Sequence, residues 1–240
     1  MPRFFTETVN GQTPVLSAAD GRHIRRSLRM RVGDTVTITD GKADYQCRID
    51  RFGDDDTVYL IVEETSPIVS EPSLKVTLYQ GLPKGDKMEW IIQKAVELGI
   101  TTVVPVATSR SVVKLDAAGG KKKQERWQKI AAEAAGQCGR GCIPTVEAPL
   151  SFKEAAARMA TERTLVFYEG GGKPLRELIT ETDTALSLFV GPEGGIAPEE
   201  LETLLAGGAV AATLGKRILR CETAPLMALS IIMALSGNAE

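Results

Sequence analysis

The 240-residue chain has few of the residues that metal centres and disulfide scaffolds require. His23 is its only histidine, and the four cysteines form no CxxC pair, standing at positions 47, 138, 142 and 221. This composition predicts neither a metal site nor disulfides and favours a reducing cytoplasm. The apolar run at 224–235 is too short to span a bilayer, and residues 1–20 lack the apolar core of a secretory signal. We therefore expect a soluble, cytoplasmic protein with no membrane partner.

The chain also lacks an overall positive charge, since its formal net charge is −2. Any affinity for nucleic acid must then come from local patches. One candidate patch is the arginine-rich segment from 22 to 31, in which we predict RNA contacts by Arg22, Arg25, Arg26 and Arg29. Ile24, Leu28 and Val32 are spaced to anchor one face while the arginines point outward to phosphates. The alternative is a solvated face whose charge is offset by neighbouring aspartates. His23 is expected to make a packing or phosphate contact in either case.

The distribution of apolar residues predicts two domains. Residues 1–66 contain β-branched or alternating runs at 35–39, 45–51 and 57–63, separated by Asp- and Gly-rich turns. A Pro- and Ser-containing linker follows at 66–73. Beyond it, strand patterns at 74–80, 101–106, 164–169, 187–190 and 210–214 alternate with helical patterns, among them 86–98, 226–235, one from Lys121 and one from Leu175. This alternation is typical of an α/β domain with a parallel sheet.

A glycine loop follows the strand pattern at 187–190. Gly191, Pro192, Glu193, Gly194 and Gly195 precede a helix that we expect to begin at Pro198 and to end before Gly207. Glycines allow a ligand to approach the backbone, and a helix start suits a polar or nucleotide ligand. A tight strand-to-helix turn without a ligand is the alternative.

A second polar loop, Gly215–Pro225, follows the strand pattern at 210–214. It holds three cations and Glu222 directly before the most apolar helix pattern of the chain. Charge beside a buried element is costly unless it is paired or bound. We favour a functional site over an Arg220–Glu222 ion pair that only stitches the helix start.

A third glycine loop, Gly170–Pro174, follows the strand pattern at 164–169. In an open α/β sheet, ligands bind beyond the carboxyl ends of neighbouring strands. If the three strands are neighbours, their loops form one site whose backbone groups suit a nucleoside.

The motifs VGPEGG at 190–195 and LGKRILRCETA at 214–224 together resemble the SPOUT class of S-adenosylmethionine-dependent RNA methyltransferases. More narrowly, they are similar to the 16S ribosomal RNA (uracil-N3) methyltransferase family, the RsmE-like proteins. The resemblance extends to HIRRSLRMRVGD at 23–34, KGDKMEWIIQKAVELGI at 84–100, TSRSVV at 108–113 and RWQKIAAEAAGQCGR at 126–140. The chain departs from this family at Gly136, where a Glu is usual.

The resemblance implies a PUA-like β-barrel RNA-binding domain at 1–70 and a SPOUT methyltransferase domain at 73–240. The latter would carry a C-terminal trefoil knot, which general rules of chain topology disfavour, so that only the resemblance supports it. It further implies a homodimer that binds S-adenosylmethionine and acts on 16S rRNA in the small ribosomal subunit. The reaction would be methylation of N3 of a specific uridine.

The same resemblance, with the loop positions, assigns residues to roles. We expect Arg220 to stabilise the uracil anion or to fix the target phosphate, and Glu222 or Glu193 to take the N3 proton. We also expect RNA contacts from Lys84, Arg110 and Arg140. Independently of the resemblance, the usual behaviour of these residue types predicts a solvated Lys87 and a core position for Trp127. The predicted cofactor-binding residues are Phe167, Glu169, Gly170, Val190, Gly191, Pro192, Glu193, Gly194, Gly195, Leu214, Gly215, Ile218, Leu219, Arg220, Thr223 and Ala224.

Two other functions stay open from the sequence. One is a non-catalytic RNA-binding or ribosome-assembly protein, against which the intact GPEGG and RILRCETA segments argue. The other is a SPOUT methyltransferase that modifies the ribose 2′-hydroxyl, against which the RILRCETA form argues.

Overall fold

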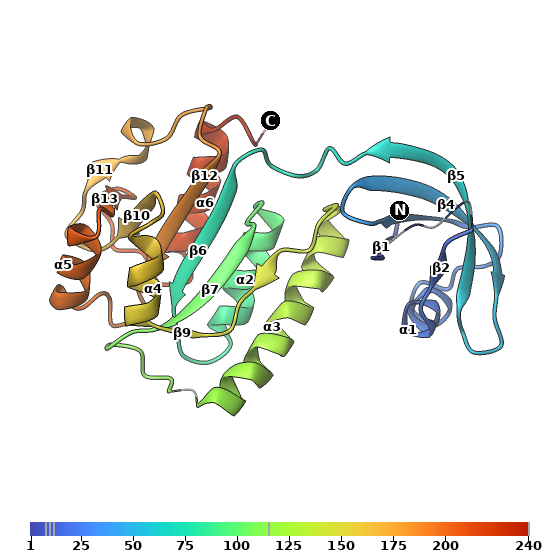
Figure 1. Ribbon diagram of the computed structural model, residues 1–240, viewed down its shortest axis with the longest axis horizontal. Helices are drawn as coiled ribbons and strands as arrows, with labels where there is room; N and C mark the ends of the chain where they lie inside the picture. Colours follow the sequence, from blue (N-terminus) through green and yellow to red (C-terminus); the bar gives the residue numbers. More distant parts are fainter. Residues whose placement is uncertain (8, 10, 12, 115, 240) are drawn as a thin grey trace. The chain divides into compact units, whose positions relative to one another are not determined.

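The chain forms two compact units in a computed structural model that describes residues 1–7, 9, 11, 13–114 and 116–239 (Figure 1). The first unit comprises Met1–Glu71 together with Ala135–Ile143, and the second comprises Pro72–Ala134 together with the chain from Pro144 onward. The first boundary falls inside the Pro-containing segment at 66–73. Residues 135–143 join the first unit because Glu71 binds this segment, accepting hydrogen bonds from the amides of Gly141 and Cys142 at 3.0 and 3.2 Å.

The first unit is built on a five-stranded sheet in the order β1-β3-β4-β5-β2. β1 pairs parallel with β3, and the other pairs are antiparallel. The strands predicted at 35–39, 45–51 and 57–63 are confirmed, although β4 and β5 extend further. Their bounds are β1 (Arg3–Phe5), β2 (Val15–Leu16), β3 (Thr35–Thr39), β4 (Ala43–Phe52) and β5 (Val58–Pro67). Alternate residues such as Val36 and Ile38 face the core, as the period of a half-buried strand requires.

The arginine-rich segment does not form one regular helix with a single apolar face, as its spacing predicts. It begins as α1 (Ala18–Arg22), which the Ser17 side chain caps by accepting from the Asp20 amide, and continues as one π-helical turn, η1 (His23–Ser27). Ile24 is buried as expected, whereas Leu28 and Val32 are exposed. The expectation that all three anchor one face is wrong because the helical path ends here, with Arg29 in the left-handed region at φ 57°.

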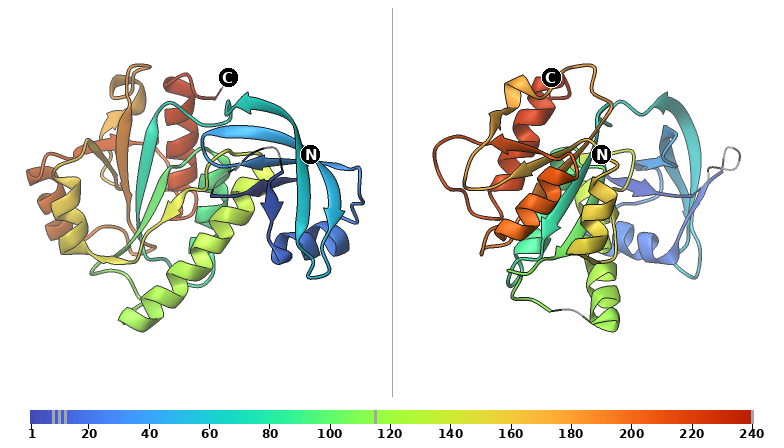
Figure 2. Two further views of the ribbon diagram at one scale, coloured as in Figure 1. Left: turned by 45° about the vertical axis from the view of Figure 1, so that its right-hand side comes forward. Right: turned by 60° about the vertical axis from the view of Figure 1, so that its left-hand side comes forward.

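The second unit is an α/β unit around a sheet in the order β11-β13-β10-β12-β6-β7-β8, with β9 also pairing with β7. The neighbouring strands described in this sheet all pair in parallel, which confirms the predicted parallel sheet. β6 (teal) and β12 (orange-brown) run side by side through its centre in both views of Figure 2. The bounds are β6 (Lys75–Gly81), β7 (Thr102–Ala107), β8 (Thr145–Val146), β9 (Leu150–Ser151), β10 (Thr164–Phe167), β11 (Lys173–Pro174), β12 (Ala185–Val190) and β13 (Val210–Thr213).

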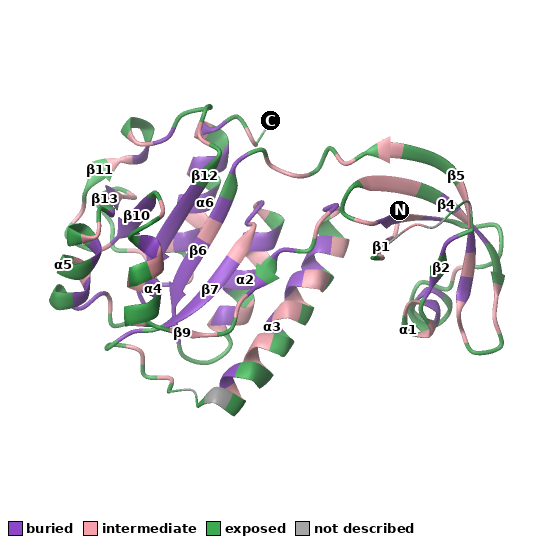
Figure 3. Ribbon diagram, viewed as in Figure 1, coloured by how far each residue is buried: buried purple, intermediate pink, exposed green. Residues whose placement is uncertain are grey.

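Helices cover both faces of this sheet. α4 (Phe152–Met159) and α5 (Pro198–Ala206) pack on the face that carries Tyr79 and Phe189. α2 (Lys87–Glu97) packs against α6 (Ala224–Leu235), which lies behind the sheet where α4 lies in front (Figure 1). The central strands between these layers are buried along their length (Figure 3). The unit is therefore a three-layer α/β arrangement.

Two further expectations about helices can be checked. Trp127 on α3 (Ala117–Cys138) is 3% exposed, which confirms its predicted core position. The helix expected from Leu175 is only a 3-10 turn, η2 (Leu175–Glu177). The chain leaves it at Thr180, whose amide donates to the Asp183 carboxylate at 2.8 Å and so starts a turn.

Candidate functional site

The strands that carry the three glycine loops are neighbours, and their carboxyl ends meet at one edge of the sheet. Phe167 at the end of β10 lies opposite Val190 of β12 and Ala212 of β13. Val190 in turn lies opposite Gln80 of β6. The loops after β10, β12 and β13 therefore leave the sheet side by side, as one site requires.

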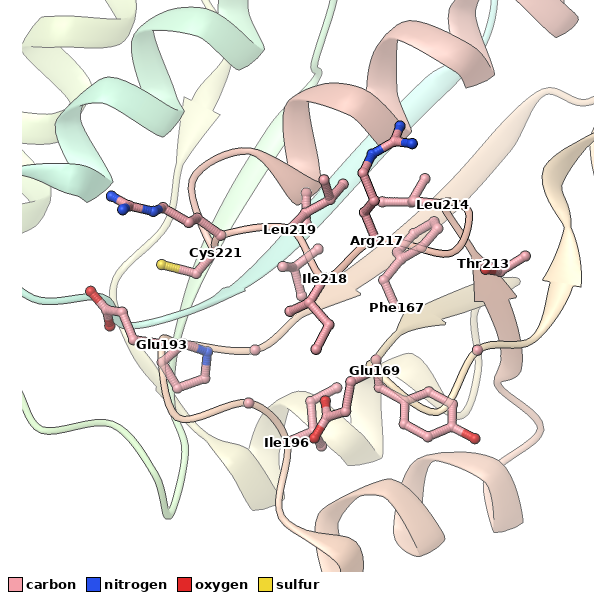
Figure 4. A pocket seen from close by; sticks show the side chains of 18 of the residues that line it. Phe167, Glu169, Glu193, Ile196, Thr213, Leu214, Arg217, Ile218, Leu219 and Cys221 are labelled. Carbon is pink, nitrogen blue, oxygen red and sulfur yellow. The ribbon is translucent and has the colours of Figure 1, made fainter.

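These loops enclose a cavity of about 550 Å³, shown from close by in Figure 4. It is lined by most of the predicted cofactor-binding residues: Phe167, Glu169, Val190, Gly191, Pro192, Glu193, Gly194, Gly195, Leu214, Gly215, Ile218, Leu219, Arg220 and Ala224. Gly170 and Thr223 are not among the lining residues. A Cβ on Gly170 would meet the Tyr168 ring at 2.2 Å, and Thr223 is the N-cap residue of α6.

The cavity has further lining residues that the sequence did not reveal. Some, such as Ile196 and Thr213, immediately adjoin the predicted motifs and could have been found by extending them. Lys87 could not, because it lies on α2, 106 residues before Glu193. The full set of additional lining residues is Lys87, Tyr168, Gly171, Ile196, Ala212, Thr213, Lys216, Arg217 and Cys221.

The loop Gly191–Gly195 is held firmly against the end of β6. A Cβ on Gly81 would lie 2.5 Å from Pro192 Cδ and 2.7 Å from Pro192 N, so only glycine permits this approach. The buried Gln80 amide group donates to the Gly191 carbonyl at 3.4 Å. Within the loop, the Gly195 amide donates to the Pro192 carbonyl at 2.9 Å, and Gly195 has φ 72°. This loop is a preformed turn.

The segment after β7 packs on the other side of that loop. Arg110 donates from Nη1 to the Gly194 carbonyl at 2.9 Å. The amide of its neighbour Ser109 donates to Oε1 of the buried Glu200 at 2.8 Å, which ties the segment to the first turn of α5. Arg110 is exposed apart from this contact, so its position leaves the remaining guanidinium donors available to a ligand.

Glu193 lies at the rim of the cavity and is bound by two lysines of another segment. Its carboxylate accepts from the Lys84 amide at 3.1 and 3.3 Å and from Lys87 Nζ at 2.9 Å. Burial alone would raise the pKa of Glu193, but these hydrogen bonds outweigh it and hold the pKa below its ordinary value. Glu193 is therefore an ionised acceptor at neutral pH, and the predicted solvated role of Lys87 is wrong.

The same lysine reaches the RILRCETA segment. Lys87 Nζ lies 3.3 Å from Glu222 Oε2, the oxygen that also accepts from the Cys221 thiol at 3.2 Å. Burial and this carboxylate raise the pKa of Cys221 to about 12, so the thiol stays protonated. Figure 4 shows Cys221 and Glu193 on the same side of the cavity. Glu222 itself does not line the cavity.

Arg220 stands apart from this cluster. Its side chain is 84% exposed and its Nη1 lies 4.0 Å from Glu222 Oε1. An exposed pair at this distance contributes little to stability. The alternative reading of the loop, an Arg220–Glu222 ion pair that stitches the helix start, is therefore poorly supported, because Lys87 holds Glu222 more closely.

The predicted RNA-binding arginines have different environments. Arg22, Arg26 and Arg29 are exposed in the first unit, and Arg25 there lies 3.1 Å from Asp56 and above the Phe52 ring. Lys84 in the second unit is likewise exposed. Arg140 is only 5% exposed, and its Nη2 donates to Glu71 at 2.6 Å. The prediction of an RNA contact by Arg140 is therefore corrected: its guanidinium serves an internal ion pair.

Within the part of the chain that the structure describes, no helix is long and apolar enough to cross a membrane. No group of three His, Cys, Asp or Glu side chains in the same part of the chain could hold a metal ion.

Comparisons with known proteins extend this picture to nearly the whole chain. Residues 70–233 match the family described as the RNA methyltransferase domain, and residues 16–63 match the RNA methyltransferase PUA domain. The chain is 38% identical to the ribosomal RNA small subunit methyltransferase E of Bacillus subtilis, covering 97% of this chain and 96% of that one. It is 31% identical to the protein of that name from Mycobacterium tuberculosis, covering 98% and 92%.

A solved structure gives the same answer. A ribosomal RNA small subunit methyltransferase E from Neisseria gonorrhoeae, crystallised with S-adenosyl methionine, matches with a TM-score of 0.89 at 33% identity over 98% of both chains. The resemblance inferred from the GPEGG and RILRCETA segments is thereby confirmed. This chain belongs to the RNA methyltransferase family, among the ribosomal RNA small subunit methyltransferases E.

Proposed function

We propose that this protein transfers a methyl group from S-adenosylmethionine to N3 of a specific uridine in 16S rRNA, on the assembled small ribosomal subunit. The observation that carries the proposal is the cavity of about 550 Å³ that unites the GPEGG and RILRCETA segments. Ligand pockets typically measure about 300–1,000 Å³, so the cavity suits a nucleoside-sized ligand. The Neisseria gonorrhoeae relative was crystallised with S-adenosyl methionine.

The residues around the cavity fit such a cofactor. A Cβ on Gly195 would meet the Glu169 carboxylate at 3.3 Å, so this glycine keeps the backbone accessible where a side chain would intrude. Phe167, Leu214 and Ile218 supply apolar walls. The loops Gly191–Gly195 and Gly215–Ala224 would hold the cofactor, which supplies a methyl group already activated on its sulfonium sulfur.

Glu193 is the better candidate to accept the uracil N3 proton. It lines the cavity and is ionised at neutral pH, whereas Glu222 is absent from the lining and binds Lys87 and the Cys221 thiol. The methyl–sulfonium bond would break as the bond from carbon to N3 forms, with the N3 proton passing to the carboxylate. Alignment of the reacting atoms alone can lower such a barrier by about 7–11 kcal/mol.

Arg220 is the candidate cation for the target nucleotide. Arg220 is one of the residues that line the cavity, its side chain is 84% exposed, and its Nη1 lies 4.0 Å from Glu222 Oε1. Removal of the N3 proton spreads negative charge onto the uracil oxygens O2 and O4, and a fixed cation there stabilises the transition state. A contact with the target phosphate is the other role open to the same side chain.

RNA docking is assigned to exposed cations of both units. In the first unit, with the PUA-domain match at 16–63, these are Arg22, Arg25, Arg26 and Arg29. In the second unit they are Lys84 and Arg110. We assign RNA binding to the domain at 1–70 and methyl transfer to the domain at 73–240. The target uridine has to be unstacked from its neighbours to reach the cavity.

The finer features implied by the family are part of the same proposal. They are a closed PUA-like barrel, a C-terminal trefoil knot, a homodimer, and function in the cytoplasm without a metal. The knot is supported by the strand order, in which the chain adds β13 beside β10 and then returns to pack α6 near β12. The apolar character of α6, which is uncharged from Ala224 to Leu235, suits burial in such an arrangement.

Nucleoside mass spectrometry of small ribosomal subunits tests the proposal. Subunits from a strain lacking the activity would be incubated with the protein and S-adenosylmethionine, and free 16S rRNA would be treated in parallel. We expect new 3-methyluridine, formed preferentially on the assembled subunit.

Other products would point to the alternatives. A 2′-O-methyl nucleoside would keep the cofactor site but refute the uracil assignment. Binding of S-adenosylhomocysteine without methylation would point to another RNA substrate. Failure to bind it would favour a non-catalytic assembly protein.

A further inference from the structure

Lys87 is the one side chain of α2 that lines the cavity among the described residues, and it contacts both loops at once. Its ammonium lies 2.9 Å from Glu193 Oε1 and 3.3 Å from Glu222 Oε2. Glu193 belongs to the loop after β12, and Glu222 to the loop after β13. A single cation thus spans two loops whose strands do not pair with each other, because β10 lies between them.

The contacts also divide the oxygens of Glu222. Oε2 accepts from the Cys221 thiol and faces Lys87, while Oε1 faces Arg220 across 4.0 Å. Without Lys87, the Glu222 carboxylate would keep its full charge, and Arg220 would be its nearest remaining cation. The unpaired carboxylate would then draw the guanidinium toward Glu222, which does not line the cavity.

We infer that Lys87 is a positioning residue for methyl transfer: it ties the two loops together and, by binding Glu222, keeps Arg220 available to the target nucleotide. The inference rests on the proposed function, in which Arg220 acts on the RNA. Lys87 itself touches neither reacting atom. It acts through Glu193, whose carboxylate it orients, and through Glu222, whose charge it neutralises.

The chain offers a closely matched control. Lys94 lies seven residues further along α2, with 30% of its side chain exposed against 34% for Lys87, and it binds Glu97 at 2.8 Å. Loss of Lys94 removes one partly exposed ion pair from this helix, and loss of Lys87 removes two. Only Lys87 contacts the loops of the cavity, so Lys87→Met and Lys94→Met separate positioning from general effects on the helix.

The experiment measures methyl transfer to small subunits under single-turnover conditions, together with S-adenosylhomocysteine affinity by calorimetry. For Lys87→Met we expect the transfer rate to fall by about 10- to 100-fold, because a small misplacement of reacting groups slows a reaction by that much. Its S-adenosylhomocysteine affinity should fall only a few-fold, and its melting temperature should match that of Lys94→Met. Lys87→Arg should retain most of the rate.

A double-mutant cycle then tests the route through Glu222. In Lys87→Met/Glu222→Gln the neutral amide no longer attracts Arg220, so the double variant should be faster than Lys87→Met alone. A loss equal to the product of the two single losses would overturn the inference, as would equal rates for Lys87→Met and Lys94→Met. A wild-type protein that binds S-adenosylhomocysteine but forms no 3-methyluridine would refute the proposed function instead, and the affinity comparison would still test the loop tie.

Discussion

The two loops that dominate the cavity differ in how the protein holds them. Gly191–Gly195 is fixed from several sides, by close backbone packing on Gly81 and by hydrogen bonds from Gln80, the Lys84 amide and Arg110. The loop that follows β13 is more exposed, with Ile218 86% exposed and the Arg220 side chain 84% exposed. One loop is a rigid platform and the other presents its side chains to solvent.

This difference assigns the two loops to different tasks. A platform made of backbone groups recognises a ligand without rearrangement, which lowers the entropy cost of binding. An exposed loop that carries an exposed arginine, Arg220, suits a substrate that arrives from solvent. Lys87 joins the two and so couples cofactor binding to the position of Arg220.

A methyl side chain at Gly81, where the loop Gly191–Gly195 packs most tightly, should displace that loop. In Gly81→Ala the new Cβ would lie 2.5 Å from Pro192 Cδ, and the loop would have to shift. We expect a loss of stability of about 1–3 kcal/mol and a loss of S-adenosylhomocysteine affinity of more than about tenfold. Thermal unfolding and calorimetry check this. Gly120→Ala is the control, since its Cβ meets Pro149 only at 3.6 Å and should stabilise α3 by about 0.5–1 kcal/mol.

The exposed loop should fail in catalysis and not in binding. Arg220→Ala should lower the rate of methyl transfer by about 100-fold, because the cation that stabilises the developing charge is lost. Stability and S-adenosylhomocysteine affinity should stay near wild type. Arg176→Ala is the control, because Arg176 is also an exposed arginine of the second unit but does not line the cavity. Unchanged turnover in Arg220→Ala would refute its role.

The stability contributed by the ion pairs of Lys87 with Glu193 and Glu222 should decrease in acid. The pKa values of Glu193 and Glu222 are held below their ordinary value of 4.5. The stability they contribute is therefore complete above that value and is lost as pH falls through the lowered folded-state pKa values. The difference in melting temperature between wild type and Lys87→Met should be constant near neutral pH and should shrink below about pH 4.5. A difference that grows in acid would contradict this assignment.

The smallest effect is expected at the most exposed apolar residue of the site. Ile218→Ser removes a side chain that is already 86% exposed, so stability should change by less than about 0.5 kcal/mol. If the loop folds over bound cofactor, S-adenosylhomocysteine affinity should still fall a few-fold as apolar contact is lost. An affinity equal to that of wild type would show that Ile218 stays in solvent in the complex.

Much of this arrangement was predictable because the relevant signals are local. The apolar runs ending in glycine identify β10, β12 and β13, and parallel topology then requires their loops to share one edge. Pro198 and Gly207 mark the ends of α5 through their own backbone preferences. The motif residues that line the cavity were found for the same reason, since they lie in continuous segments.

The features that were missed depend on contacts between distant segments. Lys87 has an ordinary helical sequence context, and only the fold brings it to Glu193 and Glu222. Arg140 belongs to a basic motif in the sequence, yet in the structure it forms an ion pair with Glu71 inside the first unit. Leu28 and Val32 follow a helical spacing, but the helix stops before they can use it. The spacing of apolar residues indicates local structural preference. It does not indicate where the chain turns or which side chain a charged residue pairs with.

Hydrogen–deuterium exchange with and without S-adenosylhomocysteine tests the contrast between the loops most directly. Peptides spanning 188–197 and 214–223 would be compared in both states. We expect amides of the first peptide to be protected before ligand is added and those of the second to gain protection mainly on binding. Equal protection of both peptides in the free protein, with no change at 214–223 on binding, would contradict the division into a platform and an exposed loop.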